Sequence, residues 1–328
     1  MPLRSVKVLR ISVTDRCDLR CVYCMPEEGV PLVPMSEMLT YEEIAAVARA
    51  ALAAGVRRFR LTGGEPLARR GVASLVRLLA GLGPDDLALT TNGLSLAGRA
   101  AELKASGLGR VTVSLDTLRP ERFEKITRRR GLDRVLAGIA AARAAGLTPV
   151  KINTVVIRGL NDDEVADFVR FARDERLEVR FIELMPTSGL GPECKELGSW
   201  RPALLVKGEE VRARIEADFG PLVPAPGGGK EGGVAKTYLL DGSTRIGFIT
   251  PLSEPFCRGC ERLRLGPEGR LRICLFDRAG IDLRQALRQD RAGPAELETL
   301  VRGAFAAKAT WERGALEALS SDMFRIGG

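Results

Sequence analysis

Short runs of β-branched residues alternate with alanine- and leucine-rich runs along the first 185 residues of the chain. Apolar side chains at every second position indicate a strand, and apolar side chains three and four positions apart indicate a helix. The expected strands are 6–13, 57–62, 86–91, 110–115, 148–156 and 177–184, and the expected helices between them are 40–55, 69–82, 95–107, 120–145 and 162–175. Strands and helices that alternate in this order predict an α/β fold with a parallel sheet.

Polar and glycine motifs stand at the ends of most of these strands. They are TDRC (14–17), TGGEP (62–66), TTNG (90–93), SLD (114–116) and LMP (184–186). An open, doubly wound sheet gathers only the loops beside its switch point, whereas the strand ends of a barrel all meet at one mouth. The placement of the motifs therefore favours a partial (β/α)6 TIM-like barrel with its chemistry at that mouth.

The pattern changes after residue 186. Residues 187–200 and 224–233 are rich in turn-forming residues, and they are followed by the short strands 237–240, 245–250 and 270–274 and by two helices near 282–290 and 294–309. We therefore expect a partial barrel over residues 1–186 and a smaller α+β region over residues 187–328.

The composition excludes several classes of protein. The chain has no long uncharged apolar run and no signal-like beginning, so we expect no membrane span and a cytoplasmic location. It holds seven cysteines and no histidine, which removes the usual general base and the usual nitrogen ligand of zinc. In a cytoplasmic protein these cysteines favour metal or redox chemistry over a disulfide framework.

The net charge of +8 suits an anionic partner, such as a nucleic acid, a phosphate or an acidic protein. Basicity by itself identifies none of these partners. The run TRRRG (127–131) is interpreted as a solvated face of the helix 120–145, not as a binding patch.

Six of the cysteines form two triplets. Cys17, Cys21 and Cys24 have the spacing C-x3-C-x2-C, and Cys257, Cys260 and Cys274 have the spacing C-x2-C-x13-C. Each triplet is one ligand short of a closed site, so the fourth ligand is either a distant residue or a position left open. Because catalytic zinc usually has a nitrogen or carboxylate ligand, all-sulfur triplets favour two iron–sulfur clusters that each leave one iron open. Cys194 is interpreted as a spare thiol.

Together these motifs resemble those of the radical S-adenosylmethionine (SAM) superfamily. The resemblance rests on the first triplet after the first strand, on Tyr23 before its last cysteine and on GGEP after the second strand. The second triplet, with Arg262 and Arg264 inside it, and the final Gly327-Gly328 resemble one branch of that superfamily. This branch converts GTP to (8S)-3′,8-cyclo-7,8-dihydroguanosine 5′-triphosphate, the first step of molybdenum cofactor biosynthesis. The resemblance covers essentially the whole chain and implies two [4Fe-4S] clusters and SAM as cofactors.

The resemblance also implies a role for individual residues. The metal ligands would be the six cysteines of the two triplets, and the contacts to SAM would be Tyr23, Gly64, Ser114 and Met185. The contacts to GTP would be Arg10, Arg60, Thr91, Lys151, Arg262, Leu263 and Arg264. The catalytic residues would be Arg262, Arg264, Gly327 and Gly328, the last two in a tail that reaches into the barrel.

Elementary chemistry supports some of these roles. Gly63 and Gly64 permit a close approach of the backbone to SAM, and Glu65 can accept a hydrogen bond from an ammonium group. Forked guanidinium groups suit a triphosphate. Lys151, taken alone, fits a snorkelling edge residue equally well.

By the same resemblance, the open iron of the first cluster chelates SAM, and an electron from that cluster cleaves the sulfonium. The 5′-deoxyadenosyl radical then abstracts hydrogen from C3′ of a GTP whose guanine is bound at the second cluster. The implied partners are a reductant protein and cyclic pyranopterin monophosphate synthase, which takes over the product. A homodimer is left open, and neither a membrane nor a nucleic acid is expected as the main partner.

Two other functions are compatible with parts of the sequence. A radical SAM maturase that modifies peptides also carries an auxiliary cluster, although such enzymes usually have more cysteines in their C-terminal extension. A zinc-dependent nucleic-acid-binding module explains the basic charge and the C-x2-C motif but not TGGEP or the repeated βα pattern. The aromatic content of 5% also offers little stacking surface for single strands.

Overall fold

The computed structural model describes residues 6–186, 200–227, 234–277 and 279–310. Cys194, Gly327 and Gly328 lie outside the described residues, so the interpretations of these three positions stay predictions.

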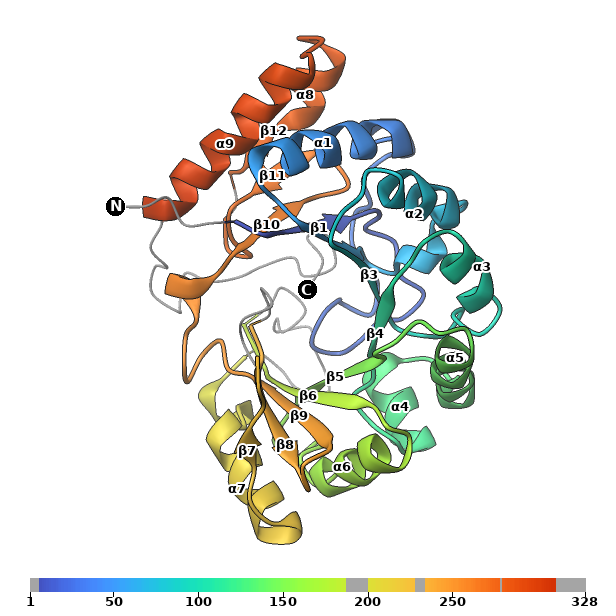
Figure 1. Ribbon diagram of the computed structural model, residues 1–328. Helices are drawn as coiled ribbons and strands as arrows, with labels where there is room; N and C mark the ends of the chain where they lie inside the picture. The colour runs from blue at the N-terminus through green and yellow to red at the C-terminus, as the bar shows by residue number, and fades with distance from the viewer. Residues whose placement is uncertain (1–5, 187–199, 228–233, 278, 311–328) are drawn as a thin grey trace.

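Six parallel strands form the middle of a curved sheet in chain order (Figure 1). They are β1 (Val8–Ser12), β2 (Arg58–Thr62), β3 (Asp86–Thr91), β4 (Arg110–Ser114), β5 (Lys151–Val156) and β6 (Glu178–Glu183). Each lies inside a range expected from the sequence, which confirms the parallel sheet. Its curvature is that of a partial barrel.

Helices lie around the outer side of the curved sheet (Figure 1). They are α1 (Tyr41–Ala54), α2 (Val72–Ala80), α3 (Ala100–Ala105), α4 (Pro120–Thr127), α5 (Leu132–Ala144) and α6 (Val165–Asp174). The first of them begins with a capping box, because the Thr40 hydroxyl accepts from the N–H of Glu43 while the Glu43 carboxylate accepts from the N–H of Thr40. The core lies between this layer and the sheet, where alternate strand residues such as Leu9 and Phe59 are fully buried.

The C-terminal half adds strands to both edges of the same sheet. β10 (Arg262–Leu265) pairs in parallel with β1, and β9 (Thr244–Ile249) pairs in parallel with β6. Antiparallel strands continue the sheet beyond them: β11 (Arg270–Arg272) and β12 (Ile281–Asp282) at one end, β8 (Lys236–Leu240) and β7 (Val223–Pro224) at the other. Residues on both sides of position 186 therefore share one sheet, and a domain boundary at this position stays a prediction.

The C-terminal region also contains α7 (Gly208–Phe219), α8 (Leu283–Arg288) and α9 (Pro294–Thr310). The last two confirm the expected helices, whereas α7 is not among the helices expected from the sequence. This helix starts after Lys207, so the usual Ser, Thr, Asp or Asn at the N-cap is missing. Short 3-10 turns are η1 (Met35–Glu37), η2 (Pro66–Ala68), η3 (Pro202–Leu204) and η4 (Cys257–Gly259). None of the described helices combines the length and the apolar character needed to cross a membrane.

The expected helix 120–145 is wrong in one respect, because it is broken into α4 and α5 at the TRRRG run. Arg128 has a φ of 54°, in the left-handed region, and its guanidinium donates to the carbonyls of Arg20 (2.8 Å) and Met25 (3.3 Å). The N–H of Arg20 in turn donates to the carbonyl of Thr127 (3.0 Å). TRRRG is therefore not a solvated helix face: its first residues hold the loop that carries the first three cysteines.

Candidate active site

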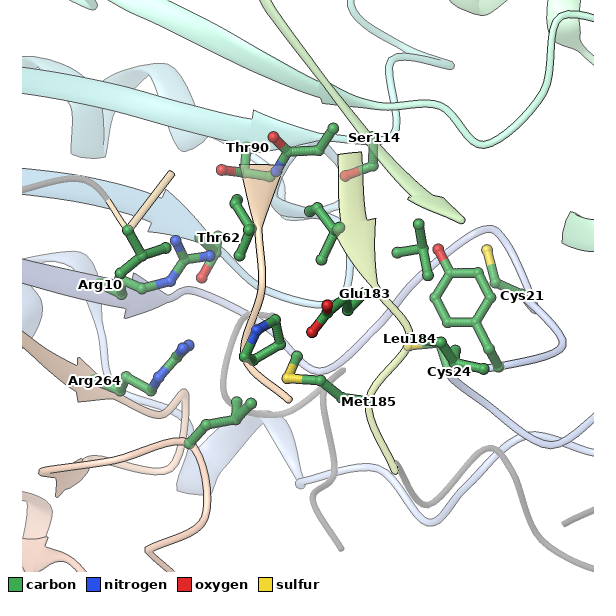
Figure 2. A pocket seen from close by; sticks show the side chains of 18 of the residues that line it. Arg10, Cys21, Cys24, Thr62, Thr90, Ser114, Glu183, Leu184, Met185 and Arg264 are labelled. Carbon is green, nitrogen blue, oxygen red and sulfur yellow. The ribbon is translucent and has the colours of Figure 1, made fainter. Parts of the chain in front are cut away.

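One cavity of about 310 Å³ gathers most of the motifs that follow the strands. Figure 2 shows Cys21 and Cys24 at one side of this cavity and Arg10 and Arg264 at the other, with Met185 between them. The cysteines of both triplets line it: Cys17, Cys21, Cys24, Cys257, Cys260 and Cys274. The topology thus brings together two cysteine triplets that are more than two hundred residues apart in the chain.

The first triplet lies on the loop after β1, and its thiols are partly buried and not in disulfides. Burial, reinforced by nearby carboxylates, raises the pKa of Cys17 and of Cys24 to about 12. Thiols at such a site lack a positive charge that would stabilise their thiolate form, and a bound metal centre supplies that charge. The all-sulfur donor set therefore fits an iron–sulfur cluster. In the part of the chain that the structure describes, no group of three or more Cys, His, Asp or Glu side chains forms a ready-made site for a single metal ion.

The GGEP turn packs directly on that loop. The N–H of Gly64 donates to the Thr14 carbonyl (2.6 Å), and the N–H of Glu65 donates to the Arg16 carbonyl (2.7 Å). A Cβ on Gly64 would lie 2.4 Å from the Arg16 carbonyl oxygen, so no larger residue fits without moving the loop. Gly63 and Gly64 also line the cavity, so the same turn holds the cysteine loop and offers backbone to a ligand.

Glu65 does not have the role expected from the sequence. Its buried carboxylate accepts from the Thr91 hydroxyl (2.8 Å) and from the N–H groups of Asn92 (2.7 Å) and Leu67 (2.8 Å). Burial raises the pKa of Glu65 to about 7, although these donors oppose the rise. The carboxylate therefore serves the chain's own donors and not an ammonium group, and it ties β3 to the GGEP turn. Thr91 itself lines the cavity.

The four residues expected to contact SAM all line the cavity: Tyr23, Gly64, Ser114 and Met185. The Tyr23 hydroxyl donates to Asp116 Oδ2 (2.6 Å), and the N–H of Val155 donates to Asp116 Oδ1 (2.8 Å). Burial raises the pKa of Asp116 to about 6. Asp116 is absent from the sequence candidates, although its place in SLD, directly after a strand, was an available signal.

The second triplet has different electrostatic surroundings. Burial would raise the pKa of Cys260, but the charges of Arg262 and Lys308 overcome this and lower it to about 6. Burial raises the pKa of Cys274. The second triplet thus lies among cations, whereas carboxylates surround the first. Its thiols are not in disulfides, and their donor set also fits an iron–sulfur cluster.

A group of arginines extends from the second triplet into the cavity. The register places Arg264 of β10 beside Arg10 of β1, and both line the cavity together with Arg262. Burial and repulsion by Arg264 and Arg262 lower the pKa of Arg10, and burial with repulsion by Arg262 lowers that of Arg264 to about 9. Buried charges of one sign favour an anionic ligand. Leu263, between the two arginines, is fully buried and does not line the cavity.

Besides Leu263, two more of the expected GTP contacts, Arg60 and Lys151, do not line the cavity. Arg60 is in register with Arg10 on the neighbouring strand and pairs with Asp86 (2.6 Å). Lys151 pairs with Glu178 (2.9 Å), and burial with repulsion by Arg180 lowers its pKa to about 8.

Arg110 and Arg180 complete this layer of ion pairs across the strands. Arg110 shares Asp86 with Arg60 (2.7 Å), and Arg180 shares Glu178 with Lys151 (2.6 Å). We call these six side chains the cationic layer: Arg60, Asp86, Arg110, Lys151, Glu178 and Arg180. Its four cations share two carboxylates, and the exposed Arg245 also pairs with Glu178 at a longer distance (3.6 Å), so positive charge is in excess next to Arg10. Sequence reasoning missed Arg110 and Arg180, although charged residues in strand alternation could have indicated them.

A curved parallel sheet with three thiols after its first strand is the architecture of radical SAM enzymes. Residues 11–172 match the model of the radical SAM superfamily, and residues 177–312 match that of Molybdenum Cofactor Synthesis C. A solved structure of Streptococcus suis SuiB bound to S-adenosylmethionine has a TM-score of 0.64 to this chain, at 16% identity and covering 98% of this chain and 72% of that one. Methylornithine synthase PylB has a TM-score of 0.51, at 18% identity and covering 69% and 66%. At these identities the likeness shows the fold alone.

Curated relatives assign the chain to one family within this superfamily. GTP 3′,8-cyclase of Pelotomaculum thermopropionicum is 52% identical over 93% of this chain and 92% of its own length. GTP 3′,8-cyclase of Moorella thermoacetica is 49% identical over 90% and 88%. The chain belongs to the GTP 3′,8-cyclase family within the radical SAM superfamily, and its cofactors are two [4Fe-4S] clusters and SAM.

Proposed function

We propose that the chain converts GTP to (8S)-3′,8-cyclo-7,8-dihydroguanosine 5′-triphosphate in the first step of molybdenum cofactor biosynthesis. The observation that carries the proposal is that both cysteine triplets face one cavity, while the buried cations gather at the second triplet and beneath it. This arrangement provides a place for SAM at one side and for an anionic substrate at the other.

Cys17, Cys21 and Cys24 would hold the first cluster beside SAM, and together these cofactors would supply the one-electron radical chemistry of the reaction. The chain's own residues position the two molecules and exclude water. Tyr23, Gly64, Ser114 and Met185 are proposed to hold SAM, because all four line the cavity that the first triplet also lines. The bond from Tyr23 to Asp116 fixes the aromatic ring relative to β4.

Arg10, Arg60, Lys151 and Arg264 are proposed to bind the triphosphate of GTP. Arg10 and Arg264 face the cavity directly, and Arg60 and Lys151 belong to the cationic layer next to them. An entering triphosphate would take over donors that the two carboxylates of this layer hold. Thr91 is proposed to contact the substrate through its cavity-facing side, whereas Leu263 can contribute only its backbone.

Arg262 and Arg264 are further proposed to act on the substrate at the second cluster, because both line the cavity together with Cys260 and interact with it electrostatically. Arg262 also lies over the ring of Phe256, with 5.5 Å from the guanidinium carbon to the ring centroid. Gly327 and Gly328 are proposed to complete the site on the resemblance alone, since they lie outside the described residues.

The experiment that tests the proposal is nucleotide-dependent cleavage of SAM. Anaerobically reconstituted protein should hold roughly eight iron and eight sulfide. With dithionite, SAM and GTP it should release 5′-deoxyadenosine together with the cyclised nucleotide, and omission of GTP should suppress the release. Zinc in place of iron would refute the proposal, and GTP-independent release would favour a peptide-modifying maturase.

The partners and the location are also proposed on the resemblance. A reductant protein would supply the electron, and cyclic pyranopterin monophosphate synthase would receive the product. A cytoplasmic location suits both partners and six thiols that are not in disulfides. A homodimer is compatible with this function and is tested by sedimentation of the reconstituted protein.

A further inference from the structure

Lys308 is a buried cation that the proposed reaction does not use. It lies near the end of α9, is 5% exposed and lines the same cavity as the second triplet. Its ammonium donates to the carbonyl of Ile273 (2.6 Å), the residue directly before Cys274. No ion pair joins Lys308 to an aspartate or glutamate among the described residues.

A buried ammonium group requires an anionic or strongly polar partner. Cys260 and Cys274 both attract Lys308 electrostatically, and the charge of Lys308 in turn acts on Cys260. The other charged group that acts on Lys308 is Arg262, which repels it. The second triplet is therefore the group that compensates the charge of Lys308.

The position of this ammonium is set by a docked helix and not by a loop. α9 is 17 residues long, and its buried residues Leu297, Val301 and Ala304 belong to the main core. Arg302 on the same helix donates to the carbonyl of Ala53 (3.0 Å) at the end of α1. A cation on such a support is held at a fixed distance from the sulfur atoms, as a preorganised site requires.

The two triplets differ in the sign of the charges that surround them. The charged groups that act on Cys17 and Cys24 are Glu65, Asp18 and Asp116, whereas Arg262 and Lys308 act on Cys260. Reduction adds one electron to a cluster that is already anionic with three thiolates, so a neighbouring cation favours the reduced form.

We propose that Lys308 is a positioning residue for the second cluster, and that its ammonium is the fixed positive charge that raises the reduction potential of this cluster above what its three thiolates alone would give. The inference rests on the proposed function only in that the second triplet must carry a cluster. Lys308 holds this charge on α9, while Arg262 holds one on β10, so two cations from different elements act on Cys260.

The test is a potentiometric titration with dithionite, followed by electron paramagnetic resonance, on the full-length reconstituted protein. Two triple-alanine variants, each lacking one triplet, assign the two cluster signals. In Lys308→Met the one-electron reduction constant of the second cluster should fall about tenfold, which is a shift of about 59 mV to more negative potential. The reduction potential of the first cluster should not change. Lys308→Arg should keep the wild-type potential of the second cluster. Arg302→Met is the control: it removes a cation from the same helix, away from the cavity, and should change the potential of neither cluster.

An unchanged second-cluster potential in Lys308→Met, or an equal shift in Lys308→Arg, would overturn the proposal. If Lys308→Met fails to hold the second cluster, Lys308→Arg decides: a restored cluster at the wild-type potential supports the charge, and a lost cluster makes Lys308 a packing residue. Wild-type protein without iron at the second triplet would instead overturn the proposed function. Normal iron content with GTP-dependent SAM cleavage and an unshifted potential would overturn only the role of Lys308.

Discussion

The hydroxyl of Tyr23 donates to Oδ2 of Asp116 across 2.6 Å, and this bond joins the loop of the first triplet to the end of β4. Asp116 is 7% exposed, and the second oxygen of its carboxylate accepts from the N–H of Val155 on β5. One buried carboxylate thus connects three segments around the place proposed for SAM.

Replacing Asp116 by Asn should change the pH dependence of stability. Burial raises the pKa of Asp116 from 3.8 to about 6, so its protonated form stabilises the fold at low pH, and this contribution is lost as the pH rises through 6. Asn cannot ionise: its Oδ1 can still accept from the N–H of Val155, and its Nδ2 donates to the Tyr23 hydroxyl, which then acts as the acceptor. The stability of Asp116→Asn relative to wild type should therefore rise between about pH 4 and about pH 8, by on the order of 3 kcal/mol at most. Urea unfolding of the apoprotein at several pH values measures it, and a pH-independent difference would contradict the prediction.

The cationic layer predicts rescue of a destabilised variant by an anion. Glu178 is 3% exposed and pairs with Lys151 and Arg180, so Glu178→Gln leaves buried cations without compensation and should cost about 3–5 kcal/mol. Tripolyphosphate should raise the unfolding temperature of this variant more than that of wild type, because it supplies the missing negative charge. Glu124→Gln, which breaks an exposed pair with Arg130, is the control and should cost less than about 1 kcal/mol. If tripolyphosphate raised the unfolding temperatures of Glu178→Gln and wild type equally, the triphosphate would bind outside the cationic layer.

Phe256 should matter for turnover through Arg262. Phe256→Leu removes a cation–π contact worth about 0.5–2 kcal/mol, so we expect GTP turnover to fall by roughly 2- to 30-fold with both clusters retained. Phe219→Leu is the matched control. The same kind of contact joins Phe219 on α7 to Arg170 on α6, and neither residue lines the cavity. Iron analysis and rates of 5′-deoxyadenosine release distinguish the two. Loss of the second cluster in Phe256→Leu would show that the ring acts on the cysteines and not on Arg262.

Arg128 should be needed for the first cluster. Arg128→Ala removes the donors to the carbonyls of Arg20 and Met25, which hold the cysteine loop, so reconstituted iron should fall from roughly eight toward roughly four per chain. Arg130→Ala is the control, since this neighbouring side chain is 85% exposed and pairs only with the exposed Glu124 among the described residues. Full iron content in Arg128→Ala would show that the loop holds its shape without this contact.

Alternation along the chain was sufficient to predict the six strands of the barrel, because each has a buried outer face and polar inner positions. It was also sufficient to place the cysteine, GGEP and SLD motifs together, since the carboxyl ends of parallel strands meet. Where two apolar runs were joined by arginines, as at 127–131, periodicity could not show the break, because it depends on contacts of Arg128 with a distant loop.

The pairs of the candidate site could not be predicted for a related reason. Asp86 with Arg60, and Glu178 with Lys151, meet across neighbouring strands, and a two-residue period does not give the register between strands. The same holds for Arg264 beside Arg10, which are separated by 254 residues of the chain. Lys308 was invisible to sequence reasoning because its partners are a carbonyl and two thiols from other elements.

The pairing of β10 with β1 and of β9 with β6 has a consequence for how the protein is made. While the ribosome has delivered only the first 186 residues, both outer strands of the parallel sheet still present unpaired N–H and C=O groups. These groups are paired only when residues 244–265 have been synthesised, and this later segment includes two cysteines of the second triplet. The stretch of translation that pairs both outer strands of the parallel sheet therefore also delivers Cys257 and Cys260, so the supply of ligands to the second cluster site begins as the edges of the barrel are covered.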